Sequence, residues 1–150
     1  MAESRDELLR YYRESRKEML AAIDGLTDEQ MSEPSLAGWA VKDHLAHLAL
    51  WDDIRAAEVE RISAGYESAW KMTETQDEVH NATAYELRRS MSAAQARWEL
   101  ERSRHKLLDA ITAATADALD PSRYGAAGLR SRHEDQHSGW IASWRGERGI

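Results

Sequence analysis

Two histidines near the C-terminus stand four residues apart, a spacing at which both side chains can bind one metal ion. They are His133 and His137, in the run Ser131-Arg132-His133-Glu134-Asp135-Gln136-His137. In an α-helix, residues four apart differ by about 40° around the axis and about 6 Å along it, so both imidazoles reach the same point. Trp140 and Trp144 continue this stripe, where simple packing would use Leu or Ile.

A second pair of histidines occurs in the most apolar run of the chain, from Gly38 to Asp53. His44 and His47 lie within the wide apolar arc of the helix that this run predicts. A buried imidazole needs a hydrogen bond or a metal, because leaving it without a partner is costly. A third imidazole from this segment would complete a set of three protein ligands and leave one coordination position open for water or substrate.

The chemistry of such a site follows from its donors. A nitrogen set suits Zn, Ni, Cu, Co or Fe(II) better than Ca or Mg, and we expect a divalent transition metal, zinc or nickel. Such an ion lowers the pKa of a bound water or activates a thiol. The alternative interpretation is that these histidines pack in the core or lie on the surface, with carboxylates as their partners.

Two residues beside His47 are candidates for catalytic roles. His44 lies about 60° around the helix from His47 and could orient a substrate or act as a base; alternatively it packs beside the site or supports a ligand. Asp43 stands one turn before His47. Its carboxylate could accept a hydrogen bond from an imidazole N–H, or it could stabilise the first turn of its own helix. The sequence leaves both pairs of alternatives open.

Tryptophans are the candidates for substrate binding, since the chain has six of them and no phenylalanine. Three stand close to the histidines and could form the wall of an apolar pocket over the metal: Trp51, Trp140 and Trp144. The same residues could instead be ordinary core aromatics. The arginine-rich segments 102–106 and 145–148 are interpreted as solvated faces.

Helices must position all of these residues, because apolar residues recur with helical spacing and no strand pattern occurs. The pattern predicts helices from Ser4 to about Gly25, from about Trp39 to Ala64, from about Thr75 to Arg89, from Ser92 through Ala118, and from roughly Leu129 to Trp144. The third of these is short and lies in the long segment 66–91. We therefore predict an all-α fold, a single domain over residues 1–150, and a four-helix bundle with one long crossover connection.

Composition narrows the class of function. The 150-residue chain has 20 Lys and Arg against 27 Asp and Glu, so nucleic acids and anionic membranes are disfavoured as partners. There is no cysteine, so any thiol in the chemistry must come from outside the chain. No run of residues resembles a signal peptide or a membrane span, and we expect a cytoplasmic protein that acts on a small molecule.

These residues also carry a resemblance to a known family. The run Gly38-Trp39-Ala40-Val41-Lys42-Asp43-His44-Leu45-Ala46-His47-Leu48, followed by Trp51, resembles the GW-x-V-K-D-x-L-A-H-L signature of the DinB/YfiT-like superfamily. His133-x-x-x-His137, followed by Ile141 and Trp144, is similar to the closing helix of that superfamily. The sequence around His44 and the Asn81-Ala82 pair after Asp77 resemble those of the ClbS/DfsB-like subgroup of self-resistance proteins.

The resemblance implies a four-helix bundle of unusual connectivity, often dimeric, so a homodimer is expected. It also implies a divalent metal bound by one histidine of the second helix and two of the fourth, which by motif matching are His47, His133 and His137. Members of the superfamily include metal-dependent S-transferases that use low-molecular-weight thiols, a mycothiol-dependent isomerase, and resistance proteins that hydrolyse or sequester a reactive natural product.

The function expected from residues and resemblance together is that of a metalloprotein acting on a small reactive molecule. The ion would activate water or an external low-molecular-weight thiol against an electrophile held among the tryptophans, as a hydrolase or S-transferase does in detoxification or resistance. One alternative is a non-catalytic protein that sequesters a reactive metabolite. Another is a structural dimer with a vestigial site.

Overall fold

The computed structural model describes residues 3–34 and 36–150, and over these residues the chain forms α-helices and no β-strand. The helices are α1 (Arg5–Ile23), α2 (Asp28–Ser32), α3 (Val41–Ser63), α4 (Glu74–Arg88), α5 (Ala93–Thr112) and α6 (His133–Arg148). Two 3₁₀ turns, Asp117–Leu119 and Pro121–Arg123, lie between α5 and α6. No helix within the described ranges has both the length and the apolar character that crossing a membrane requires.

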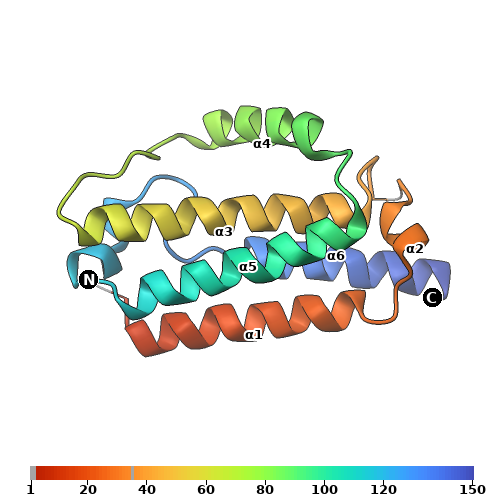
Figure 1. The fold of residues 1–150 in the computed structure, drawn as a ribbon, viewed down its shortest axis with the longest axis horizontal. Helices are drawn as coiled ribbons and strands as arrows, with labels where there is room; N and C mark the ends of the chain where they lie inside the picture. The colour runs from red at the N-terminus through yellow and green to blue at the C-terminus, as the bar shows by residue number, and fades with distance from the viewer. Residues whose placement is uncertain (1–2, 35) are drawn as a thin grey trace.

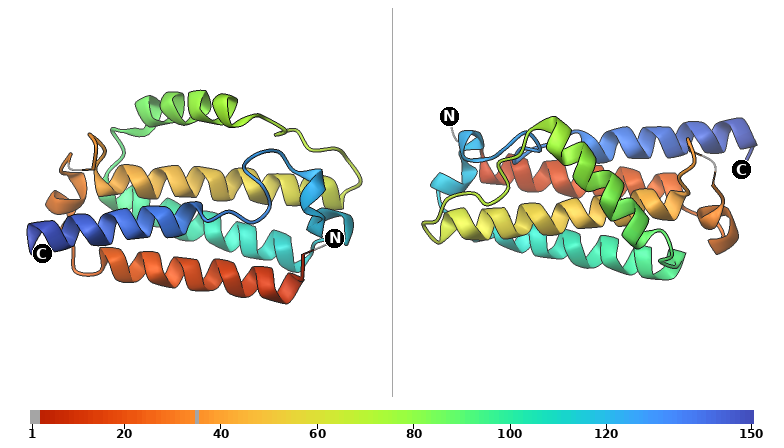
Figure 2. Two further views of the ribbon diagram at one scale, coloured as in Figure 1. Left: turned by 180° about the vertical axis from the view of Figure 1, so that it is seen from behind. Right: turned by 90° about the horizontal axis from the view of Figure 1, so that it is seen from above.

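The long helices α1, α3, α5 and α6 form a four-helix bundle (Figure 1). α3 packs mainly against α5, and α1 packs mainly against α6. Figure 1 shows α3 and α5 running in the same direction, so the chain between them must return along the length of the bundle. The return includes α4, which lies outside the bundle and crosses α3 obliquely (Figure 2). The predicted all-α bundle with one crossover connection is therefore confirmed.

Capping residues determine several of the helix starts. Ser4 accepts a hydrogen bond from the Glu7 amide at the start of α1, and Ser92 accepts one from the Gln95 amide at the start of α5, as the sequence predicts. Thr73 and Gln76 form a reciprocal capping box that starts α4 one residue before the predicted position. These local signals explain why most helix boundaries agree with the prediction.

The last two predicted helices have wrong boundaries. α5 ends at Thr112, and the apolar rhythm that continues to Ala118 belongs to a loop and a 3₁₀ turn that pack on the core. α6 begins at His133 and not at Leu129, because distant tyrosines hold the preceding segment out of the helix: Tyr12 donates a hydrogen bond to the Leu129 carbonyl and Tyr11 donates one to the Ser131 carbonyl. The late start places the first turn of α6 beside the middle of the bundle (Figure 2).

A layer of four buried charges divides the core into two apolar clusters. Arg16, Asp52, Arg104 and Glu134 come from α1, α3, α5 and α6, and each is at most 7% exposed. Arg16 Nε donates to Glu134 Oε1 over 2.7 Å, and Arg104 Nε donates to Asp52 Oδ2 over 3.0 Å. Each arginine also pairs with the other carboxylate, so the network has no unpaired charge. The interpretation of residues 102–106 as a solvated face is therefore wrong for Arg104, which is buried among acids of other helices.

Candidate metal centre

Three imidazoles from two helices meet beside this charged layer. α3 supplies His47, and the first two turns of α6 supply His133 and His137. The Nε2 atom of His133 lies 2.7 Å from Nε2 of His47 and 3.1 Å from Nε2 of His137. One nitrogen of each ring lies within 4.8 Å of the other two, so these three histidines could together hold a metal ion.

Burial keeps these imidazoles neutral, which is the form that binds a metal. Desolvation lowers the pKa of His47 to about 3 and that of His133 to about 4. It also places the pKa of His137 far below its ordinary value, with repulsion from the neighbouring imidazoles as a further cause. The positive charge of Arg55 contributes to the lowered pKa values of both His47 and His133.

The donor set fits a transition metal. Three neutral imidazoles directed at one point place their nitrogen lone pairs against each other, and a cation at that point converts this repulsion into coordination. The donors are all nitrogen, which suits zinc and its neighbours in the first transition row better than calcium or magnesium. Three protein ligands leave a further coordination position for a small molecule.

His44 contacts the centre through His137. Their Nδ1 atoms lie 2.6 Å apart, and His44 is 4% exposed. If His137 uses Nε2 as a ligand, its proton lies on Nδ1 and is donated to Nδ1 of His44. The proton of His44 must then lie on Nε2, a buried nitrogen with no hydrogen-bond partner among the described residues. His44 is thus arranged to position His137, with one N–H left for a ligand.

We expect His44→Ala to weaken metal binding by about 10- to 100-fold, the usual cost of losing a residue that orients a ligand. His44→Asn should recover most of the affinity, because an asparagine oxygen can replace Nδ1 as the acceptor for His137. Competition of each variant with a chromophoric chelator measures the dissociation constant. Equal affinities for the alanine variant and the unmodified protein would contradict the positioning role.

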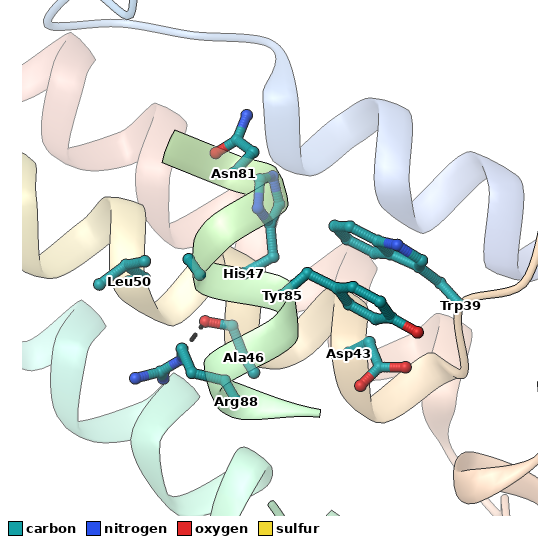
Figure 3. Close-up of a pocket in the computed structure, with 9 residues that line it drawn as sticks. Trp39, Asp43, Ala46, His47, Leu50, Asn81, Tyr85 and Arg88 are labelled. Atoms are coloured by element: carbon teal, nitrogen blue, oxygen red, sulfur yellow. Dashed lines mark hydrogen bonds between the residues drawn. The ribbon is translucent and has the colours of Figure 1, made fainter. Parts of the chain in front are cut away.

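Asp43 binds the backbone at the start of its own helix. Its Oδ2 accepts a hydrogen bond from the Ala40 amide over 2.8 Å, so the carboxylate stabilises the start of α3. This arrangement corresponds to the second of the two alternatives for Asp43, the stabilisation of its own helix. Asp43 also lines a small pocket beside His47, which Figure 3 shows.

The turn before α3 places an aromatic ring over the centre. Leu36 and Trp39 exchange two backbone hydrogen bonds, and the residues between them, Ala37 and Gly38, have φ values of 56° and 92°. The turn directs Trp39 onto His47, with ring centroids 5.4 Å apart. Tyr85 of α4 stacks on the indole of Trp39, with the planes 6° apart (Figure 3).

A groove of about 900 Å³ opens beside His44, His47 and His137. Trp140 and Trp144 line it, together with the stacked Trp39 and Tyr85. Trp140 is 51% exposed, whereas Trp144 is also part of the core. Exposed carboxylates complete the lining: Glu78, Glu86 and Glu147. The groove therefore offers flat apolar surfaces with acidic groups beside them.

Trp51 lies apart from the other two predicted tryptophans. It lines a second pocket, of about 340 Å³, on the side of the centre where His133 lies. Its Nε1 donates to Asn81 Oδ1 over 2.7 Å. Trp51 is one turn beyond His47 on α3, and this displacement along the helix takes it to the second pocket. The structure thus brings Trp140 and Trp144 together at the groove and separates Trp51 from them.

Several residues of the site were not identified from the sequence. Trp39 and Tyr85 line the groove, and Arg55 lines the second pocket. Arg55 could have been found, since it follows His47 and Trp51 at steps of four residues and so lies on the same side of the helix. Tyr85 gave no such signal, because the packing of α4 across α3 is a property of the crossover.

Comparisons with known proteins agree with this architecture. The family model described as mycothiol maleylpyruvate isomerase N-terminal domain matches residues 12–140. A crystal structure of an uncharacterised protein from Escherichia coli UTI89 superposes with a TM-score of 0.82 at 15% sequence identity, covering 98% of this chain and 95% of that one. This similarity concerns the fold alone. No curated protein matches the chain.

Proposed function

The chain belongs to the mycothiol maleylpyruvate isomerase N-terminal domain family, within the DinB/YfiT-like superfamily, and from this premise we propose that it is a metal-dependent protein acting on a small electrophile. The observation that carries the proposal is the convergence of His47, His133 and His137, two of which line the groove. A divalent ion held by these residues would supply a Lewis acid that activates water or an external thiol. The thiol must be external because the chain has no cysteine.

The groove supports an apolar or aromatic electrophile. Trp39 and Tyr85 form a rigid stacked wall, and Trp140 presents an indole face that is half exposed. Flat side chains of this kind bind planar apolar groups with little loss of side-chain freedom. His44 Nε2 offers a buried N–H donor for a polar atom of the bound molecule. The family description names mycothiol, which supports a low-molecular-weight thiol as the second reactant.

Turnover of a model electrophile tests this function. We expect conjugation of monobromobimane with N-acetylcysteine to be accelerated by protein reloaded with zinc or nickel, and the acceleration to be lost after metal removal. Hydrolysis without added thiol would assign the nucleophile as water. Binding of the electrophile with no catalysed reaction under any condition would reject the enzyme and favour a sequestering protein.

A further inference from the structure

The second pocket beside the centre is basic, in contrast to the groove. It is lined by arginines from α3 and from the loop before α6, namely Arg55, Arg130 and Arg132, and Asp77 is the acid of its lining. Asp77 Oδ1 accepts a hydrogen bond from Trp70 Nε1 over 3.2 Å, and among the described residues it forms no ion pair with these arginines. His133 lines this pocket, whereas His47 and His137 line the groove. The three-histidine centre therefore lies between two pockets of opposite charge.

Arg55 is the unusual residue of the basic pocket. It is 6% exposed, yet no carboxylate of the described residues pairs with it. Its guanidinium makes only long hydrogen bonds, 3.4 Å each, to the carbonyls of Ala127 and Gly128, and lies 5.8 Å from the centroid of the Trp51 ring. The other buried arginines of the bundle core, Arg16 and Arg104, each bind two carboxylates.

A buried guanidinium without an anionic partner is costly, because its desolvation is only weakly compensated by carbonyl dipoles. Its neighbours add to the positive potential. Arg132 is exposed at the start of α6, a helix end that favours negative charge, while Arg130 pairs with Glu3 over 3.1 Å. The charge of Arg55 also reaches the centre, since it contributes to the lowered pKa of His133.

We propose that the basic pocket is a binding site for the carboxylate of a small anionic ligand, held by the Arg55 guanidinium beside His133. The planar fork of arginine matches a carboxylate and can donate two parallel hydrogen bonds to it. Trp51 and Asn81, whose side chains are hydrogen-bonded to each other, provide a fixed wall for the ligand. Identification of this ligand as the thiol cosubstrate rests on the proposed function; the anion site itself does not.

The arrangement implies that the two reactants use different pockets. An electrophile with apolar, flat surfaces suits the groove, where the exposed carboxylates would repel an anion. A thiol that carries a carboxylate suits the pocket at Arg55. Both pockets share Asn81 in their lining, and they reach the three-histidine centre from different sides, the groove at His47 and His137 and the basic pocket at His133, so neither reactant needs to pass through the site of the other.

Titration of metal-free protein with N-acetylalanine, a thiol-free carboxylate, tests the site without any catalytic step. The readout is the ¹⁵N NMR signal of the Trp51 indole N–H, assigned with Trp51→Phe. We expect N-acetylalanine to shift this signal with saturation, and its methyl ester to bind at least about 10-fold more weakly. This comparison uses the unmodified chain, so it does not depend on the folding of a variant. Equal binding of acid and ester would overturn the proposal.

Two arginine variants make the test specific. Arg55→Gln should weaken binding of N-acetylalanine by about 10- to 100-fold, the loss expected for a charge-assisted hydrogen bond. Arg145→Gln is the matched control, because Arg145 also donates to backbone carbonyls, those of Ala22 and Asp24, but lies on the last turn of α6. It should bind like the unmodified protein. Equal losses in both variants, or none in Arg55→Gln, would overturn the proposal.

Further outcomes separate this inference from the proposed function. Binding of inorganic phosphate without binding of N-acetylalanine would overturn the assignment of a carboxylate. Specific binding of N-acetylalanine in a protein that shows no metal-dependent turnover would support the anion site and reject the enzyme. Metal-dependent turnover with the same thiol KM in Arg55→Gln and the unmodified protein would support the enzyme and reject the anion site as its cosubstrate pocket.

Discussion

His137→Ala is expected to remove stable metal binding. The residue supplies one of the three imidazoles that could hold the ion, and its ring lies between His133 and His44. Zinc sites with four protein ligands have binding free energies of about 10–16 kcal/mol, or about 2.5–4 kcal/mol per ligand. Loss of one ligand should therefore weaken binding by about 100- to 1,000-fold. Elemental analysis after purification without a nickel column, together with chelator competition, measures the change.

The matched control is His105→Ala, which removes an exposed histidine of α5. This variant should retain the metal content of the unmodified protein, and His133→Ala should behave like His137→Ala. Turnover should follow metal content across the series. Equal and negligible metal in all four proteins would contradict the metal centre.

Asp52→Asn is expected to lower the free energy of unfolding more than any single substitution at the surface. Asp52 is 2% exposed and accepts hydrogen bonds from both Arg16 and Arg104. The substitution keeps the size of the side chain and removes its charge, so two buried guanidinium groups share the single carboxylate of Glu134. Breaking a buried ion pair in this way costs about 3–5 kcal/mol of unfolding free energy. Urea denaturation of the metal-free protein measures it through the midpoint and slope.

The adjacent residue provides the control for this experiment. Asp53 pairs with Lys106 over 3.3 Å, and the two side chains are 38% and 46% exposed. An ion pair at the surface contributes about 0–1 kcal/mol, so Asp53→Asn should leave the midpoint almost unchanged. Similar midpoints for the two variants would show that the charged layer contributes little to the stability of the bundle.

Local signals made much of the fold predictable. Ser4 and Ser92 cap helices where the sequence indicates, and the four-residue spacing of His133 and His137 already places both rings on one side of a helix. The interactions that were missed join residues far apart in the chain. Tyr12 holds the carbonyl of Leu129, and this contact shortens the start of α6. No pattern within residues 125–135 contains that information.

The burial of charged side chains was the feature that the sequence predicted least well. Arg104 stands in a polar run typical of a solvated helix face, whereas Arg55 places a charge on the same side of α3 as His47 and Trp51, and both are buried. Arg104 is buried because acids from two other helices reach it: burial opposes its charge, but the carboxylates of Asp52 and Glu134 together raise its pKa above the ordinary value. Arg55 is buried beside Trp51 under the loop before α6. Sequence alone does not state which helices meet at one level of a bundle.

The position of α4 separates the shape of the pockets from the geometry of the candidate metal ligands. α4 forms part of the wall of both pockets, through residues such as Asn81 and Tyr85, but it supplies none of the three histidines. Of its 15 residues, all of them described, only Asp77 is buried. Mutations along this helix can therefore alter which molecules fit while the ligand geometry and the bundle stay intact. The scaffold is consequently well suited to diversification by selection and to libraries that randomise α4 alone.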